Sequence, residues 1–188
     1  RELAAFIRRF RNHGIDTDHR TREQTGMWRY EMLDLGYNYR ITDLQCALGI
    51  SQLKKLEAWI ARRRNIAQRY DNAFAADSVI RPMRALADRQ HARHLYPVRL
   101  RNPQTPGGRD QIFRDLRTSG IGVNVHFFPV HLQPYYRRRF ATAPGLCPEA
   151  EQAAHELLSL PLHAGMSDQD ADYVINAGGI INVCTEYL

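Results

Sequence analysis

The amino-acid sequence predicts an α+β fold, in which a small sheet is covered by helices and reached through one long helix. Three observations support this prediction. A helical pattern without proline runs from Thr42 to Phe74, residues 94–100 and 122–127 have the composition of strands, and shorter helical patterns lie between and after them. The order strand, helix, strand and then helices is typical of α+β domains.

The composition fits a soluble globular protein. The 188 residues suffice for one domain or one and a half, and 44% of them are hydrophobic and 24% charged. No stretch of about 18 apolar residues occurs, so we expect no membrane span and no membrane partner. The three cysteines are far apart, which favours reduced thiols and a cytoplasmic location. Because a helical pattern is already running at the first residue and no initiator Met is present, we expect a piece of a longer chain.

The N-terminal residues 1–13 are predicted to form a helix that ends at Gly14. Its apolar stripe consists of Leu3, Phe6, Ile7 and Phe10. Residues 15–35 are polar and show no clear period, which predicts an exposed loop.

The long helix begins with the capping-box pattern of Thr42 and Gln45. Its apolar stripe consists of Leu53, Leu56, Ile60, Ala67, Tyr70 and Phe74. At 1.5 Å per residue this helix would be about 50 Å long. Because a small domain cannot cover such a length, we expect its first part to contact another domain or subunit.

The remaining segments alternate between short elements. We expect a loop at 102–108, a helix at 108–120 that Gly120 ends, and a strand at 122–127. A helix from about Pro148 to Leu158, a short extended piece and a last helix follow. Ser167 and Asp170 open that last helix.

Four histidines, His91, His94, His126 and His131, suggest either metal ligands or the polar rim of a cleft. His126 and His131 are five positions apart on an extended segment interrupted by proline, and no carboxylate is near them in sequence. The rim of a cleft is therefore the better interpretation, and we expect no metal. A phosphate-binding loop and a nucleophile elbow are also missing from the sequence.

The formal net charge of +6 raises nucleic acid as a partner. The arginines are scattered, however, and no recognition-helix pattern or strand aromatics accompany them. We expect no nucleic-acid partner, although a basic nucleic-acid-binding module remains an alternative.

The order of five sequence blocks is more specific than composition. These blocks are RNHGI (11–15), LGYNYRITDLQCALGISQLKKLEAWIARRRNIAQRY (35–70), HARHLYPVRL (91–100), GIGVNVHFFPVHLQPYY (120–136) and LLSLPLHAGMSDQD (157–170). Together they resemble the C-terminal half of the DegT/DnrJ/EryC1/StrS family of pyridoxal-phosphate-dependent sugar aminotransferases. Within this family, the likeness is to the aminotransferases of the pseudaminic-acid pathway, which act on a UDP-linked 4-keto-6-deoxy amino sugar.

The resemblance implies the C-terminal small domain of a fold type I pyridoxal-phosphate transferase. Residues 1–40 would be the tail of the large cofactor-binding domain, 41–75 the connecting helix and 76–188 the small domain. It also implies a homodimer with an active site shared across the interface. Glutamate would be the amino donor, and a nucleotide-linked keto sugar the acceptor, for polysaccharide or flagellin glycan biosynthesis.

The resemblance also implies site residues. Asn38 would donate from its amide to the cofactor phosphate of the partner subunit, with Arg40 close by and Tyr37 lining the pocket. Asn38 could instead be a turn residue, and the tyrosines could be ordinary interface packing. Substrate contacts would come from the strand that holds Val123, Asn124, Val125 and His126, and from His131.

No catalytic residue is assigned within this chain. The lysine that binds the cofactor as a Schiff base lies upstream in the family, and the two lysines present, Lys54 and Lys55, do not match its motif. We therefore expect the 188 residues alone to be inactive. Because that upstream lysine decides between amination and other chemistry, a sugar dehydratase or a regulatory homologue also stays open.

Overall fold

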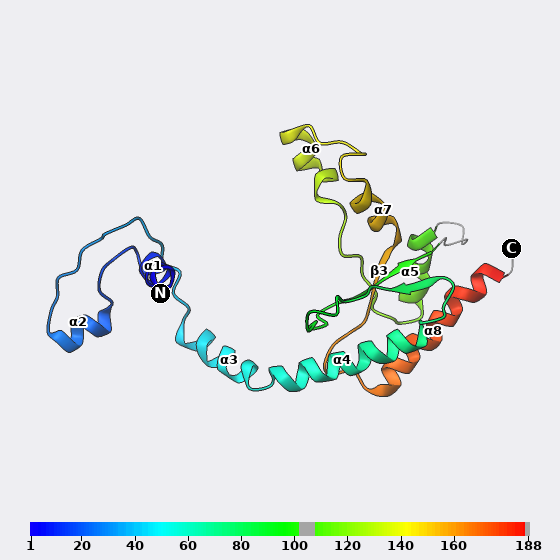
Figure 1. Ribbon diagram of the computed structural model, residues 1–188, viewed down its shortest axis with the longest axis horizontal. Helices are drawn as coiled ribbons and strands as arrows, with labels where there is room; N and C mark the ends of the chain where they lie inside the picture. Colours follow the sequence, from blue (N-terminus) through cyan, green and yellow to red (C-terminus); the bar gives the residue numbers. More distant parts are fainter. Residues whose placement is uncertain (102–107, 187–188) are drawn as a thin grey trace. The chain divides into compact units, whose positions relative to one another are not determined.

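The computed structural model describes residues 1–101 and 108–186, with side chains up to Ala177 in the second range. The chain divides into an N-terminal unit, Arg1–Lys55, and a C-terminal unit, Leu56–Leu188 (Figure 1). This division falls inside the segment predicted as one connecting helix. The predicted loop at 102–108 lies almost wholly outside the described residues, and so does the side chain of Cys184.

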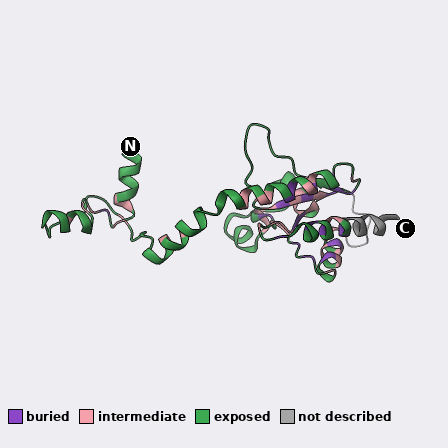
Figure 2. Ribbon diagram, turned by 90° about the horizontal axis from the view of Figure 1, so that it is seen from below, coloured by how far each residue is buried: buried purple, intermediate pink, exposed green. Residues whose placement is uncertain are grey.

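The N-terminal unit contains α1 (Glu2–Phe10), α2 (His19–Thr25) and α3 (Asp43–Leu53). None of these helices has a buried residue, and most of the unit is exposed (Figure 2). The exposed side chains include large apolar ones such as Leu3, Trp28 and Leu44. The N-terminal unit therefore has no hydrophobic core of its own and leaves an extensive apolar surface uncovered.

The expectation that 15–35 is only a loop is wrong, because α2 lies within it. Asp18 caps this helix by accepting a hydrogen bond of 2.8 Å from the Thr21 amide, and Gly26 ends it with a φ of 67°. The helix HRTREQT has no apolar stripe, so hydrophobic periodicity could not detect it. Only its two end signals were visible in the sequence.

The single long helix predicted for 41–75 is also wrong. The structure has α3, with the expected capping box of Thr42 and Gln45, and then a separate α4 (Leu56–Ala73). At the break, the Lys55 amide bonds to the carbonyl of Gln52, three residues back, instead of four. The seven-residue repeat did not reveal this break, because Leu53 is 66% exposed and the buried part of the stripe begins only in the second half of α4.

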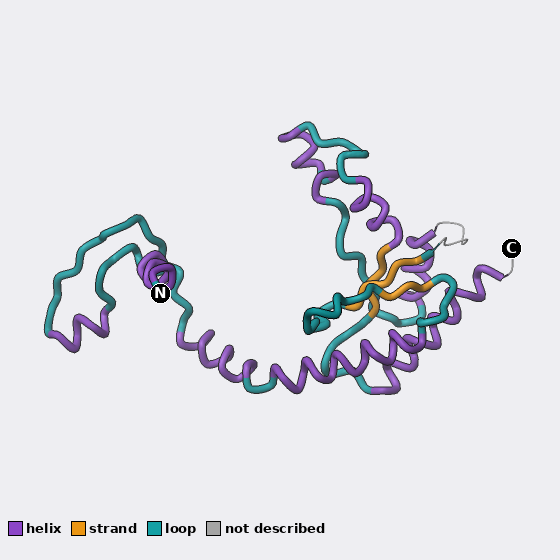
Figure 3. Tube along the Cα trace, viewed as in Figure 1, coloured by secondary structure: helices purple, strands orange, loops and turns teal. Residues whose placement is uncertain are grey.

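The C-terminal unit contains one antiparallel sheet in the order β1-β2-β3 (Figure 3). Its strands are β1 (Ile80–Pro82), β2 (Tyr96–Leu100) and β3 (Leu157–Leu160). In the register, Ile80 faces Leu100 and Tyr96 faces Leu160. The α+β class with a small sheet is thus confirmed, and so is the strand predicted in 94–100. The short β1 was not predicted.

Helices α4, α5 (Gly108–Thr118) and α8 (Asp168–Glu186) pack their apolar side chains against one face of this sheet. Tyr70 at the centre is fully buried, and its hydroxyl donates to the carbonyl of Pro161 over 3.0 Å. Its ring contacts that of Tyr96 edge to face, with centroids 5.0 Å apart. Burial raises the pKa of both tyrosines. The core of the unit is therefore organised around an aromatic pair.

The segment 122–127, predicted as a strand, is not one. Asn124 alone forms a bridge, with Ser159 of β3, and the Val125 amide bonds to the Asn124 side chain over 2.7 Å. Because the Asn124 side chain accepts the hydrogen bond of the Val125 amide, that amide is not available to a neighbouring strand, which explains why no strand forms here. Phe127 at the end of this segment has a side chain that is 73% exposed.

An arm of the C-terminal unit consists of η1 (Val130–Leu132), α6 (Pro134–Phe140) and α7 (Pro148–Glu156). The helix predicted from Pro148 is confirmed as α7, whereas α6 was not predicted. The capping pattern predicted for α8 is confirmed as well, because Ser167 and Asp170 exchange hydrogen bonds of 2.8 and 3.0 Å with each other's backbone amides. Over the described residues, the helices are too short or too polar to cross a membrane.

Candidate functional site

The loop that contains Tyr37, Asn38 and Arg40 is bonded to the end of α1 and to the turn after it. The Tyr37 amide donates to the carbonyl of Phe10 over 2.8 Å, and its carbonyl accepts the His13 amide over 3.0 Å. An isolated bridge joins Asn12 to Asn38. The RNHGI and GYNYR blocks, separate in sequence, therefore form one local structure within the N-terminal unit.

Two glycines make this close crossing possible. Gly14 has a φ of +70°, and a Cβ on it would lie 1.7 Å from the carbonyl oxygen of Asp34. A Cβ on Gly36 would lie 2.1 Å from the amide nitrogen of Gly14. Because neither backbone can move away without breaking the crossing, a side chain at either position is excluded.

The tyrosines of the loop pack against α1. The rings of Tyr37 and Tyr39 stack with centroids 5.1 Å apart, and that of Phe10 meets Tyr37 edge to face at 5.3 Å. Tyr37, predicted to contact substrate, is still 47% exposed. Its ring thus braces the loop and leaves about half of its surface accessible.

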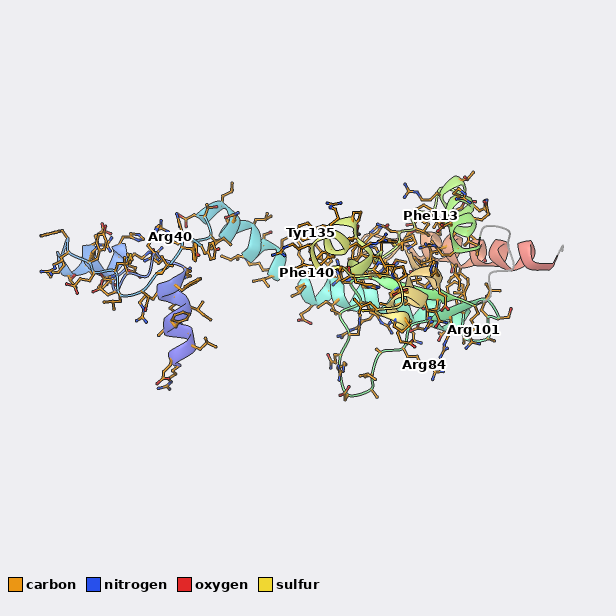
Figure 4. The ribbon with its side chains drawn as sticks, turned by 90° about the horizontal axis from the view of Figure 1, so that it is seen from above. Arg40, Arg84, Arg101, Phe113, Tyr135 and Phe140 are labelled. Atoms are coloured by element: carbon orange, nitrogen blue, oxygen red, sulfur yellow. The ribbon has the colours of Figure 1, made fainter. Side chains whose placement is uncertain are left out.

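Arg40 is held between two asparagines. Its Nε donates to Asn38 Oδ1 and its Nη1 to Asn12 Oδ1, each over 3.0 Å. Figure 4 shows Arg40 within the N-terminal unit. Both acceptors are neutral amide oxygens, so the positive charge is positioned without being neutralised. Because Asn38 Oδ1 accepts from Arg40, its NH₂ group is the part that remains to donate. A guanidinium and an amide donor side by side fit a phosphate group.

The second predicted region lies in the C-terminal unit, around a cavity of about 570 Å³. Asn124 and His126, both predicted to contact substrate, line this cavity. His126 Nδ1 lies 2.9 Å from the hydroxyl of the buried Ser159, which orients the ring. The polar side chains of this cavity are therefore partly fixed by β3.

Val123 and Val125 are placed differently. The side chain of Val123 is buried in the core, and that of Val125 is half-buried against the core. Neither residue lines the cavity. Their backbone amides are also bonded already, that of Val123 to the carbonyl of Ile121 and that of Val125 to the side chain of Asn124, so the structure does not bring these two residues to the cavity.

His131 is not brought to this cavity. Its Nε2 lies 2.8 Å from Glu151 Oε1 of α7, so that a carboxylate distant in sequence is its partner. The backbone amides of Gly145 and Cys147 also donate to Glu151. These amide bonds, with that of Gly145 foremost, and then the contact with His131 lower the pKa of Glu151. In this structure His131 therefore connects η1 to α7 within the arm.

The described residues contain no group of three metal-ligating side chains. Lys54 and Lys55 are exposed at the break between α3 and α4. Sequence reasoning missed Asn12, Ser159 and His163 as site residues. The RNHGI block was a usable signal for Asn12, whereas Ser159 and His163 enter the cavity only through the pairing of β3 and the loop that follows it.

Comparison with known proteins gives a consistent assignment. The model of the DegT/DnrJ/EryC1/StrS aminotransferase family matches residues 1–178. An uncharacterized protein of Methanocaldococcus jannaschii and the spore coat polysaccharide biosynthesis protein SpsC of Bacillus subtilis are each 38% identical over 94% of this chain. The structure of Helicobacter pylori PseC, an aminotransferase of pseudaminic-acid biosynthesis, matches 96% of the chain with a TM-score of 0.81 and 28% identity. The chain spans 46% of the length of each of these proteins.

Proposed function

Because the chain belongs to the DegT/DnrJ/EryC1/StrS aminotransferase family, we propose that the whole protein is a pyridoxal-phosphate-dependent sugar aminotransferase. It transfers the amino group of glutamate to the C4 keto group of a nucleotide-linked 4-keto-6-deoxy sugar. The likeness to SpsC and PseC supports a role in polysaccharide or glycan biosynthesis. The arrangement of Arg40 between two neutral amides is the observation that carries the proposal.

The cofactor phosphate is the ligand for which this arrangement is suited. Arg40 binds one face of the phosphate through its guanidinium, and Asn38 donates its amide hydrogens beside it. Asn12 holds the guanidinium in place from the other side. When bound, pyridoxal phosphate supplies the carbonyl that accepts the amino group and the electron sink that stabilises charge at the reacting carbon.

The loop serves a neighbouring protomer in a homodimer. The large apolar side chains left exposed on the N-terminal unit support this, because contiguous exposed apolar surface is typical of surfaces that are covered in an assembly. Tyr37 lines the shared site with the exposed half of its ring.

The keto sugar is bound in the C-terminal unit. His126, whose ring is oriented by Ser159, and Asn124 provide the polar groups of the cavity. His131 positions the arm instead of touching the sugar.

The 188 residues alone do not turn over, because the two lysines they contain lie together at the break between α3 and α4 and do not match the motif of the Schiff-base lysine. The test of the proposal uses the whole protein. Replacing Asn38 with Ala is expected to weaken pyridoxal-phosphate binding, measured by cofactor absorbance. Replacing Asn72 with Ala is the matched control, because Asn72 is an exposed asparagine of α4 whose side chain accepts a hydrogen bond from Gln68, far in sequence from the Arg40 loop. Equal cofactor affinity in the Asn38→Ala variant and the parent would contradict the assignment.

The reaction is tested by following 2-oxoglutarate release from glutamate in the presence of a UDP-linked 4-keto-6-deoxy sugar. Release that depends on the keto sugar supports aminotransfer. A whole protein that consumes the sugar without glutamate would indicate a different reaction.

A further inference from the structure

A second cavity of the C-terminal unit, of about 500 Å³, lies beside β1 at the edge of the sheet. Its walls come from the end of α4, from β1 and the segment that follows it, and from the end of β2. Four of its lining residues are arginines, Arg81, Arg84, Arg93 and Arg101, against two aspartates. The cavity therefore carries an excess of two positive charges, and neither the family assignment nor the proposed active site uses it.

The two aspartates are already engaged by other groups. Asp71 accepts a hydrogen bond of 2.6 Å from the hydroxyl of Tyr96 and pairs with Arg93 over 3.2 Å. Asp77 accepts the backbone amides of Val79 and Ile80 over 2.8 and 2.7 Å, which fixes the start of β1. Asp71 is therefore paired with Arg93, and the charge of Asp77 is set against three further arginines, which leaves the net excess of two positive charges in the cavity.

Those three arginines line the same cavity from β1, from the segment that follows it and from the residue after β2. Across 1–101 and 108–177, no ion pair involves Arg81, Arg84 or Arg101. The Arg101 amide bonds to the carbonyl of Val79 over 2.7 Å, so the residue is tied to the beginning of β1. Figure 4 shows Arg84 and Arg101 on the same edge of the unit.

Arg81 has a further like charge opposite it, because it faces Arg99 in the β1–β2 register. Like charges that are directly opposite in an antiparallel pair repel. Arg99 is compensated by Glu156 of α7. Among the described residues, no carboxylate forms an ion pair with Arg81. A bound anion would therefore reduce the repulsion between the positive charges at this edge of the sheet.

We propose that this cavity binds a small anion with more than one phosphate group, of which inorganic diphosphate is the simplest member. Guanidinium groups bind phosphate oxygens in a planar, two-point geometry, and three of them match an anion with several charges better than a monocarboxylate. A volume of about 500 Å³ is also in the range of small-molecule sites. None of the lining residues belongs to the Arg40 loop or to the cavity of His126.

The test is calorimetric titration of the whole protein with inorganic diphosphate at low salt, with acetate as a comparison anion. We expect saturable binding of diphosphate at one site per chain in this cavity and none of acetate. Replacing Arg84 and Arg101 together with Ala is expected to weaken binding about tenfold or more. The control replaces Arg114 and Arg117, two exposed arginines of α5 outside the cavity, and is expected to bind as the parent does.

An Arg40→Ala variant separates this site from the proposed cofactor site. Diphosphate binding that survives in the Arg40→Ala variant and is lost in the Arg84/Arg101 variant supports the cavity, whether or not the proposed aminotransfer is correct. No binding by the parent, undiminished binding by the Arg84/Arg101 variant, or loss confined to the Arg40→Ala variant would overturn the proposal. Arg84→Ala alone, which removes one exposed side chain, serves if the double variant does not fold.

Discussion

Replacing Asn12 with Asp is the change that best separates a phosphate site from a purely structural loop. Asn12 Oδ1 lies 3.0 Å from Arg40 Nη1, so a carboxylate of the same shape would form an ion pair there. If the loop has only a structural role, this pair leaves cofactor binding unchanged. The free energy of unfolding would then be equal to that of the parent or higher by up to about 1 kcal/mol.

If Arg40 binds the cofactor phosphate, the same substitution weakens binding. A phosphate on the far side of the guanidinium would lie about 7 Å from the new carboxylate, where two unit charges repel by about 0.6–1.2 kcal/mol at effective dielectric constants of 80 to 40. A dianionic phosphate doubles this energy, so the dissociation constant rises roughly sevenfold to sixtyfold.

The assay is titration of the whole apoprotein with pyridoxal phosphate, together with urea unfolding. Asn65→Asp is the matched control, because Asn65 accepts from Arg62 on α4 and the change adds the same charge beside another arginine. Weaker cofactor binding in the Asn12→Asp variant, with stability retained and the control unaffected, is the expected result. An Asn12→Asp variant that binds pyridoxal phosphate as tightly as the parent would refute the reasoning.

Three further changes test the structure itself. Gly36→Ala places a Cβ 2.1 Å from the amide of Gly14 and should abolish the crossing of the two blocks, seen as loss of amide-exchange protection there, whereas Gly49→Ala, with open space around it, should not. Glu151→Gln should remove a contribution to stability that is lost in acid. The pKa of Glu151 lies below its ordinary value of 4.5, so the ionised carboxylate stabilises the fold above that pH, and this stabilisation is lost as the pH falls through the lowered pKa. A variant with the same acid unfolding profile as the parent would contradict this. Tyr96→Phe removes a hydrogen bond to a carboxylate and should lower the free energy of unfolding in urea by about 1.5–3 kcal/mol.

The sequence was sufficient where a signal is local. The capping box that starts at Thr42 and the one at Ser167 each need only residues three apart, and both are present in the structure. The strand in 94–100 was also predictable from its composition, and in the structure its buried side chains alternate with half-buried ones as in a β-strand.

The failures occur where the signal is absent or ambiguous. Helix α2 is polar all round, and β1 is only three residues long, so neither has a periodicity to detect. The apparent strand at 122–127 does not form because Asn124 takes the next amide with its own side chain. The contact of His126 with Ser159 could not be predicted from the sequence, because it depends on the position of β3 in the folded sheet.

The candidate site shows the same division. Asn38 and Arg40 could be selected from the sequence by the resemblance, but the contact of Arg40 with Asn12 spans 28 residues and depends on the glycine crossing. The carboxylate beside His131 is likewise twenty residues away. Long-range partners of this kind follow from the tertiary fold alone.

The break between α3 and α4 has a practical consequence for handling the protein. Lys54 and Lys55 are the sole lysines of the sequence, both are exposed, and the N-terminal unit ends at Lys55. Within these 188 residues, an endoproteinase specific for lysine would therefore have targets only at this one place. A brief digestion would separate the C-terminal unit, which contains the hydrophobic core, from the N-terminal unit without designing a truncation.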